Sequence, residues 1–331
     1  MENEGWHEGS LLGLSGYYWQ SCTLHAGVKL AVFTLIGDDS LSVETIAERL
    51  KGDRRGTETL LHALTAMKLL QKERDRFANT PASRSLLCKD SDGYIGHMIL
   101  HHHHLAASWV RLDEAVREGK PVRKRASYSE GEWRESFLMG MFNTAMRTAP
   151  AMAEAIDLSG CHRLLDLGGG PGTYAVHFCL RNPDLKATVY DLPTTRPFAE
   201  KIIGRFGLSD RIEFVPGDYM KEDIPGGYDA TWLSHILHAH GPQACREILG
   251  KAVSVLGPGG KILVHDFILD DTMDGPLFPA LFSLNMLLGT PKGRAYSQEQ
   301  IGEMLSGAGI RQIERMPFHG PTDSGLMMGV V

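Results

Sequence analysis

Three histidines stand close together in the segment from Leu233 to His240, at positions 235, 238 and 240. The segment follows an apolar run that is typical of a strand. Histidine has an ordinary pKa of about 6.5, so near pH 7 it is mostly neutral and able to take a proton from a reacting group. The pattern therefore indicates general-base chemistry. The structural alternative is that these histidines only cap the helix that follows.

A glycine-rich turn lies upstream, in the sequence LLDLGGGPG at residues 164–172. An apolar strand leads into small residues and then into a helix, so that a ligand can approach the backbone and the unpaired N–H groups of the helix start. A dinucleotide-binding turn would have a glycine at the position of Thr173, and a P-loop would end in Gly-Lys-Ser/Thr. Because neither feature is present, the pattern disfavours both phosphate sites.

Acidic residues follow the next two predicted strands. Asp191 comes directly after the run 187–190, and Gly217-Asp218-Tyr219 follows the run 212–215. A carboxylate at the second strand of a nucleotide-binding sheet can accept hydrogen bonds from both ribose hydroxyls, and a carboxylate beside an aromatic ring can contact adenine. Since open α/β sheets bind ligands at the carboxyl ends of their strands, these residues and the glycine turn predict one nucleoside site.

The elements that position this site are short apolar runs that alternate with helical stretches, which is typical of an α/β fold with a parallel sheet. The predicted strands are 163–167, 187–190, 212–215, 230–233 and 261–265, with further β-like runs at 312–315 and 326–331.

The N-terminal part has a helical pattern in a winged-helix order. Its second helix is largely apolar beyond Arg54 and Arg55, which favours burial against a partner chain over DNA binding. The predicted elements are helices over 43–50, with Ser42 as N-cap, and 55–70, a hairpin over 71–76, and long helices over 96–118 and 132–156.

Composition sets limits on the class of protein. The 331 residues are 43% hydrophobic and 22% charged, which predicts a globular protein of two domains. The net charge of −6 gives no general attraction to nucleic acid or anionic lipid. Five scattered cysteines without a C-x-x-C pair, an acidic start and no apolar run of membrane-spanning length predict a cytoplasmic protein with reduced thiols.

The motifs LLDLGGGPG, VYDLP, FVPGDY and LGPGGKILVHDF, with the stretch from Trp232 to His240, resemble the class I S-adenosyl-L-methionine (SAM)-dependent methyltransferases. Nearly the whole chain is similar to the dimeric small-molecule O-methyltransferases typified by plant caffeate and bacterial antibiotic enzymes. The resemblance implies an all-α, winged-helix-like dimerisation domain over 1–105, a helical connector over 106–158 and a Rossmann-like SAM domain over 159–331. It also implies a homodimer whose partner chain helps to wall the acceptor pocket.

The same resemblance implies the roles of particular residues. The family's general base falls on His238 and one of its two acidic partners on Asp266, whereas the other falls on Ala295. Ala239 stands where relatives usually carry Asp or Asn. The residues that would hold SAM and its product S-adenosyl-L-homocysteine (SAH) are Gly168, Gly170, Asp191, Gly217, Asp218, Tyr219 and Ser234, the last at a position often occupied by lysine in the plant enzymes.

Four apolar or small residues match acceptor positions of the family. Phe142 and Met146 match positions beside the transferred methyl group, and Met286 and Thr290 match acceptor contacts. From the pattern alone, methionine and aromatic residues at such spacing are core residues.

The predicted function is transfer of the methyl group of SAM to a hydroxyl of a small molecule, with His238 as base and Asp266 as its orienting partner. The absent second acid leaves open an acceptor that needs no base, such as a thioether, an ionised thiol or an amine. A second alternative is a SAM-responsive regulator that binds DNA through the winged helix.

A run of histidines from His101 to His104 follows His97 by one helical turn. Two imidazoles on one helix face can bind a metal ion. The run lacks nearby carboxylate or thiolate ligands, and the resemblance calls for no metal in methyl transfer. We therefore expect no metal site, and we expect these histidines to line the acceptor pocket or to lie on a helix surface.

Overall fold

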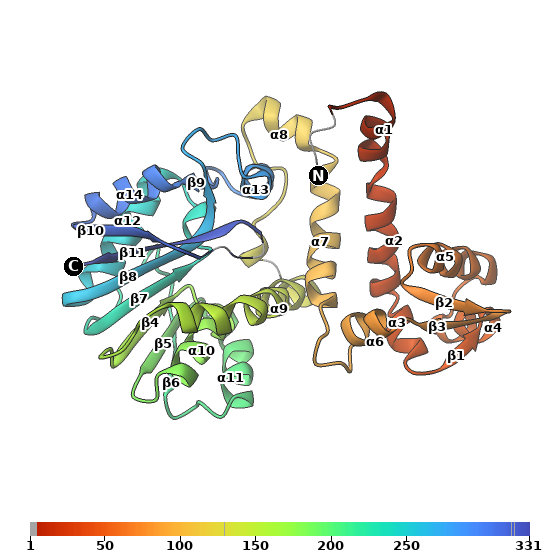
Figure 1. Ribbon diagram of the computed structural model, residues 1–331, viewed down its shortest axis with the longest axis horizontal. Coiled ribbons are helices and arrows are strands. Elements are labelled where there is room, and N and C mark those ends of the chain that lie inside the picture. The colour runs from red at the N-terminus through yellow and green to blue at the C-terminus, as the bar shows by residue number, and fades with distance from the viewer. Residues whose placement is uncertain (1–4, 129, 319, 321) are drawn as a thin grey trace. The chain divides into compact units, whose positions relative to one another are not determined.

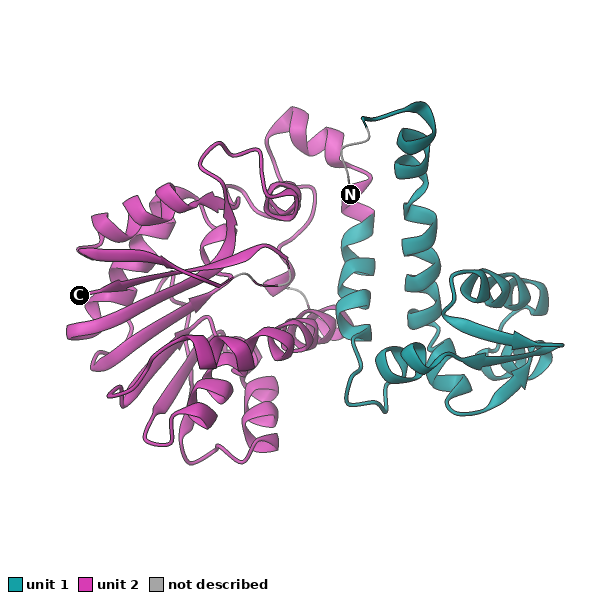
Figure 2. Cartoon of the chain, in the orientation of Figure 1, with its two compact units in different colours: residues 1–106 teal, residues 107–331 magenta. Residues whose placement is uncertain are grey.

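The computed structural model describes residues 5–128, 130–318, 320 and 322–331. The chain divides into two compact units, Met1–Ala106 and Ala107–Val331, which Figure 2 shows in teal and magenta. Each unit has its own hydrophobic core. The predicted division into 1–105, 106–158 and 159–331 stays a prediction.

The first unit is mainly helical and contains a small antiparallel sheet with the strand order β1-β3-β2 (Figure 1). The predicted helix over 43–50 is confirmed as α4, where the Ser42 hydroxyl accepts a hydrogen bond from the Thr45 amide. The predicted hairpin is confirmed as β2 and β3. The elements are α1 Glu8–Gly16, α2 Tyr18–Lys29, α3 Val32–Ile36, β1 Ser40–Ser42, α4 Val43–Leu50, α5 Arg54–Ala66, β2 Leu70–Glu73, β3 Arg76–Asn79, α6 Pro81–Leu87 and α7 Gly96–Trp109, which crosses the boundary between the units.

Helix α5 is shorter than the predicted helix over 55–70. Lys68 adopts a left-handed backbone with a φ of 58°, and the chain reverses there into β2. The prediction that the apolar side of this helix packs against a partner chain is wrong for Leu61 and Leu64. Both side chains are fully buried in the core of their own unit.

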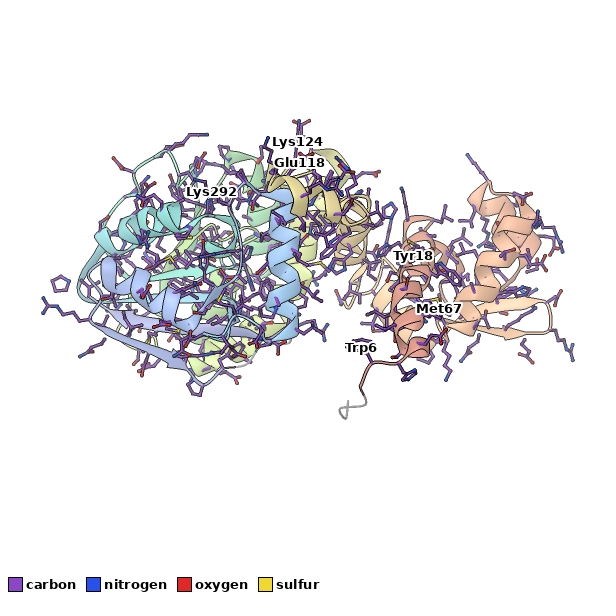
Figure 3. All side chains as sticks on the ribbon, turned by 90° about the horizontal axis from the view of Figure 1, so that it is seen from above. Trp6, Tyr18, Met67, Glu118, Lys124 and Lys292 are labelled. Carbon is purple, nitrogen blue, oxygen red and sulfur yellow. The ribbon has the colours of Figure 1, made fainter. Side chains whose placement is uncertain are left out.

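Large apolar side chains remain exposed along α1, α2 and their flanks, among them Trp6 and Tyr18, which Figure 3 labels. Trp19 is 69% exposed and Leu12 is 65% exposed. Large apolar patches that stay exposed on a protein surface are typical of interaction sites. This α1–α2 surface consists of Trp6, Leu11, Leu12, Leu14, Tyr17, Tyr18, Trp19 and Leu30.

The second unit is built on a large sheet with the strand order β10-β11-β8-β7-β4-β5-β6, and β9 pairs with β8. The strands from β8 to β6 are parallel, as predicted, whereas β11 is antiparallel to both of its neighbours. The elements are α8 Leu112–Glu118, η1 Ala126–Tyr128, α9 Gly131–Ala155, β4 Arg163–Leu167, α10 Thr173–Arg181, β5 Lys186–Asp191, η2 Pro193–Thr195, α11 Arg196–Arg205, β6 Ile212–Pro216, β7 Tyr228–Ser234, η3 Leu237–Ala239, α12 Pro242–Ser254, β8 Leu256–Leu269, α13 Leu277–Gly289, β9 Tyr296–Ser297, α14 Gln298–Gly307, β10 Gln312–Met316 and β11 Ser324–Val330.

Helices cover both faces of this sheet (Figure 1). Helices α9, α10 and α11 pack on one face, and α12 and α14 pack on the other. The central strands are consequently apolar on both sides, as expected of a covered parallel sheet. The predicted helix over 132–156 is confirmed as α9, whereas the one predicted over 96–118 is two helices, α7 and α8. None of the helices described is long and apolar enough to cross a membrane.

Candidate active site

A cavity lies at the carboxyl ends of the parallel strands, beside α9. It is lined by Gly168–Pro171 after β4, by Asp191 at the end of β5, by Asp218–Met220 after β6 and by Ser234–Ile236 after β7. All the predicted cofactor residues line this cavity except Gly217. A Cβ atom at Gly217 would collide with the hydroxyl of Tyr190. Glycine at this position therefore allows Tyr190 to pack closely against the backbone.

The glycine turn after β4 brings backbone to the cavity. Gly168 and Gly170 have φ angles of 69° and 54°, in the left-handed region that favours glycine. A Cβ atom at Gly168 would collide with the side chain of Ile236, whereas a Cβ at Gly170 would meet nothing within 4 Å. The turn therefore requires glycine at Gly168 for close packing, and it leaves open space over Gly170.

Asp191 is held in place by hydrogen bonds to both of its carboxylate oxygens. The Gly170 amide donates to Oδ2 at 2.8 Å, and the Leu192 amide and Thr195 hydroxyl donate to Oδ1 at 2.6 and 2.9 Å. Thr195 in turn accepts a hydrogen bond from the buried guanidinium of Arg134 at 2.8 Å. Burial raises the pKa of Asp191, and the three donors oppose this effect. The carboxylate is thus oriented before any ligand arrives.

Asp218 and Tyr219 form the next side of the cavity. Asp218 accepts a hydrogen bond from the Met220 amide at 3.0 Å and pairs with Lys221 at 2.9 Å. Although partial burial opposes ionisation, these two partners lower the pKa of Asp218. The Tyr219 hydroxyl lies 3.2 Å from His240 Nε2. Both residues are therefore fixed, with a charged carboxylate beside an aromatic ring.

His238 and Asp266 form a buried pair. His238 Nδ1 lies 2.6 Å from Asp266 Oδ1, and the Phe267 amide donates to the same oxygen at 2.8 Å. Although burial opposes the ionised form, the imidazoles of His238 and His235 hold the pKa of Asp266 well below its usual range. A carboxylate at this distance assigns the proton to Nδ1, because Nδ1 must then be the donor. This leaves the lone pair of His238 on Nε2.

Several side chains that line the cavity were not predicted as site residues, and His235 and Asp166 are two of them. His235 lines the cavity, and its Nδ1 lies 3.6 Å from Asp266 Oδ1. Asp166 also lines the cavity, next to Gly169, and within the described part of the chain neither of its carboxyl oxygens has a partner in hydrogen-bond geometry. Burial raises the pKa of Asp166 to about 7. Asp166 stands two residues before Gly168 in the sequence LLDLGGGPG, and this position was a usable signal for it. Nothing in the cluster of three histidines distinguished His235 as a residue of the cavity.

The four predicted acceptor contacts are not among the residues that line this cavity, and their role toward an acceptor stays a prediction. Phe142 is buried in the core, and Met146 Sδ lies 3.4 Å from His177 Nε2. On the same helix, Met141 and Ala145 line the cavity.

Met286 and Thr290 are both buried at the end of α13. The Thr290 hydroxyl donates to the Met286 carbonyl and accepts from the Gly293 amide, each at 2.8 Å, so its hydrogen bonds are internal. Ala295, at the position of the second acid, is fully buried.

The histidine run of α7 is spread around the helix. His101 is buried, and His103 Nε2 lies 3.0 Å from Lys29 Nζ. Within the described part of the chain, these histidines do not converge with other metal-ligating side chains. Their predicted place in an acceptor pocket stays a prediction.

The fold and the cavity define a nucleoside-binding α/β domain, and comparisons with known proteins identify its family. Residues 109–311 match the O-methyltransferase domain and residues 12–89 match the O-methyltransferase dimerisation domain. The chain is 33% identical to 3-hydroxy-5-methyl-1-naphthoate 3-O-methyltransferase from Streptomyces sahachiroi, over 97% of this chain and 94% of that protein. It is 30% identical to an N,N-dimethyltransferase from Streptomyces rimosus, over 93% and 92%. The structure of human N-acetylserotonin methyltransferase in complex with SAM is similar, with a TM-score of 0.86, 27% identity and coverage of 100% and 99%.

The chain belongs to the O-methyltransferase family and is a SAM-dependent methyltransferase. The predicted fold class, enzyme class and methyl donor are thereby confirmed. The comparisons do not favour the alternatives of a base-free S-methyltransferase or a DNA-binding regulator.

The cavity suits SAM, which is a cationic nucleoside. Three carboxyl groups, those of Asp166, Asp191 and Asp218, line it, and the glycine turn leaves open space at Gly170. Opposite charges attract strongly where water is partly excluded.

Proposed function

We propose that this enzyme methylates a hydroxyl oxygen of a small aromatic molecule, with His238 as general base and Asp266 as its positioning partner. The observation that carries the proposal is the buried His238–Asp266 pair, whose Nδ1–Oδ1 distance is 2.6 Å. It stands next to the cavity, because the ring of His238 lies 5.9 Å from the ring of His235, which lines it.

In this proposal Gly168, Gly170, Asp191, Asp218, Tyr219 and Ser234 hold SAM and its product SAH. Asp191 offers oriented carboxylate oxygens to the two ribose hydroxyls. Asp218 and Tyr219 offer a hydrogen-bond acceptor and a ring to the adenine. When bound, SAM supplies an electrophilic methyl group on its sulfonium.

The proton of the acceptor hydroxyl would go to Nε2 of His238 as the acceptor oxygen bonds to the methyl carbon and the bond from that carbon to the SAM sulfur breaks, which leaves SAH. Asp266 keeps the imidazole in the tautomer that has its lone pair on Nε2, and it stabilises the imidazolium that results. The two side chains therefore lower the barrier to methyl transfer, and the proton stays on His238 without passing to Asp266. Positioned base catalysis of this kind contributes on the order of 10²–10⁴ in rate.

Aromatic side chains beside His238 support an aromatic acceptor. The ring of Phe282 lies 4.8 Å from His238 and 4.5 Å from Phe267, and Phe278 at the start of α13 is 37% exposed. Flat apolar rings favour stacking with another aromatic ring. The relative from Streptomyces sahachiroi, which is named for a hydroxynaphthoate, supports the same acceptor class.

The test is a set of matched acceptors incubated with the enzyme and isotope-labelled SAM, with products read by mass. The set contains a naphthol, the naphthylamine and naphthalenethiol of the same skeleton, and the methyl ether of the naphthol as a blocked control. We expect the label on the naphthol and none on the ether. Label on the amine or the thiol alone would contradict the proposed hydroxyl acceptor.

The proposal includes a homodimer in the cytoplasm. The exposed α1–α2 surface lies largely within the match to a dimerisation domain, and it supports pairing with a second copy. The five cysteines are all free thiols, which supports a reducing compartment.

Replacing Trp19 by glutamate is expected to weaken the dimer by about 30-fold or more, because truncation of a central interface tryptophan costs ~2 kcal/mol or more. The neighbouring exposed Gln20 provides a matched control, and Gln20→Glu should leave the dimer intact. Sedimentation over a range of concentrations measures both. An unchanged dimer in Trp19→Glu would contradict pairing through this surface.

A further inference from the structure

One carboxylate of the site faces two imidazoles. His235 and His238 lie in the segment that follows β7, and Asp266 lies on β8. A nitrogen of each histidine and a carboxylate oxygen of Asp266 lie within 4.8 Å of one another. Among the residues that the structure describes, this is the group of side chains that converges in the manner of metal ligands.

The Nδ1 atom of His235 is the unexplained member of this group. It is buried, no hydrogen-bond partner meets it in the described chain, and it lies 3.6 Å from Asp266 Oδ1. If Nδ1 is unprotonated, its lone pair faces a carboxylate oxygen, and the two repel each other. If Nδ1 is protonated, its N–H lies too far from that oxygen to form a hydrogen bond. A cation between the two atoms removes either cost.

The backbone holds His235 toward Asp266. His235 has a φ of 58°, in the left-handed region, and its amide donates to the His265 carbonyl at 2.8 Å. Its ring packs 4.4 Å from Phe267 and 4.6 Å from His265. The imidazole is therefore fixed in place before any ligand binds, which is what a preorganised ligand set requires.

We propose that His235, His238 and Asp266 form an inhibitory site for a divalent transition-metal ion of the zinc class. Two imidazole nitrogens and one carboxylate oxygen are a ligand set that zinc accepts, with a fourth position left to water. Tetrahedral ligands at about 2.0–2.1 Å from zinc stand roughly 3.3 Å apart. The observed separations from Asp266 Oδ1, 2.6 Å to His238 and 3.6 Å to His235, bracket that value.

The inhibitory effect rests on the proposed role of His238 as base. When the metal bonds to His238 Nδ1, the proton of that nitrogen leaves to solvent, and no electron transfer is involved. Nε2 takes up one proton from solvent in exchange, so the imidazole stays neutral and carries its single proton on Nε2. An imidazole in that tautomer has no lone pair for the acceptor hydroxyl, so methyl transfer stops.

The experiment uses the full-length enzyme after removal of metals with a chelator. Zn²⁺ is titrated by calorimetry and Co²⁺ by visible absorption, into the wild type and His235→Asn. Asparagine tolerates a left-handed backbone and removes the imidazole. His162→Asn, at an exposed histidine outside the site, is the matched control. Binding by the α7 histidines is common to all three proteins and cancels in the comparison.

We expect the wild type and His162→Asn each to bind one metal ion per chain. Their Co²⁺ complexes should show the visible absorption of tetrahedral cobalt. The metal affinity of His235→Asn should be lower than that of the wild type by at least roughly 10–100-fold. Loss of a residue that only supports a metal ligand already costs that much, and here a ligand itself is lost. Zn²⁺ should inhibit methyl transfer by the wild type, and a chelator should restore it. The activity of His235→Asn should be the same with and without Zn²⁺. Equal melting temperatures establish that the variant is folded, and His235→Gly, which also accepts the left-handed backbone, repeats the test if it is not.

Equal metal affinity in the wild type and both folded His235 variants would overturn the metal site and leave the proposed function standing. Metal binding that depends on His235 but does not inhibit would overturn the inhibitory role and, with it, His238 as the base. The two failures are therefore distinguishable.

Discussion

Replacing His238 by asparagine is expected to lower kcat by about 10²–10⁴ while SAM affinity changes by less than about twofold. In the wild type, His238 Nδ1 lies 2.6 Å from Asp266 Oδ1, and the side-chain amide of asparagine keeps a hydrogen-bond donor near that oxygen. It removes only the basic nitrogen. Steady-state kinetics with saturating SAM measures kcat, and calorimetry measures the SAM affinity.

Asparagine is preferable to alanine at this position because Asp266 is only 2% exposed. Removal of one partner of a buried pair leaves an uncompensated charge and costs about 3–5 kcal/mol of stability, which would confuse loss of catalysis with loss of folding. His162→Asn serves again as the control and should be fully active. Full activity of a folded His238→Asn would exclude base catalysis by this residue.

Replacing Asp191 by alanine is expected to weaken SAM and SAH binding by about 10–100-fold or more. Each hydrogen bond to a charged group contributes about 1.5–3 kcal/mol, and 1.4 kcal/mol corresponds to a factor of ten. The change also removes the acceptor for the Gly170 amide, so the glycine turn loses an anchor.

Calorimetric titration of SAH measures this loss directly, and kcat at saturating SAM should stay close to the wild-type value because Asp191 does not contact the base. Asp184→Ala, at an exposed acid that precedes β5, is the matched control and should bind SAH normally. Unchanged SAH affinity in Asp191→Ala would show that the nucleoside lies elsewhere.

The sheet and the nucleoside site could be predicted because their signals are local in the sequence. The parallel strands β4, β5 and β6 are short apolar runs that end at or next to a glycine or an acid, and parallel strands bring those ends to one edge of the sheet. The run 163–167 and the acid Asp191 are examples, since β4 has those bounds and Asp191 lies on the cavity.

Features that depend on tertiary contacts could not be predicted in the same way. On α9, one residue corresponds to about 100° of rotation, so the pattern alone could not show that Met141 and Ala145 line the cavity. The apolar side of α5 was equally compatible with an internal core and with a partner chain. The approach of His235 to Asp266 depends on a left-handed backbone that histidine adopts only occasionally.

The most direct test of the proposed mechanism is a crystal structure of the enzyme with SAH and an aromatic hydroxyl acceptor. We expect the nucleoside over the turn from Gly168 to Gly170, with its ribose hydroxyls on Asp191. We expect the acceptor oxygen within about 2.6–3.2 Å of His238 Nε2, the reach of a general base. SAH bound outside this cavity, or an acceptor oxygen beyond reach of His238 both directly and through a single water, would contradict the mechanism.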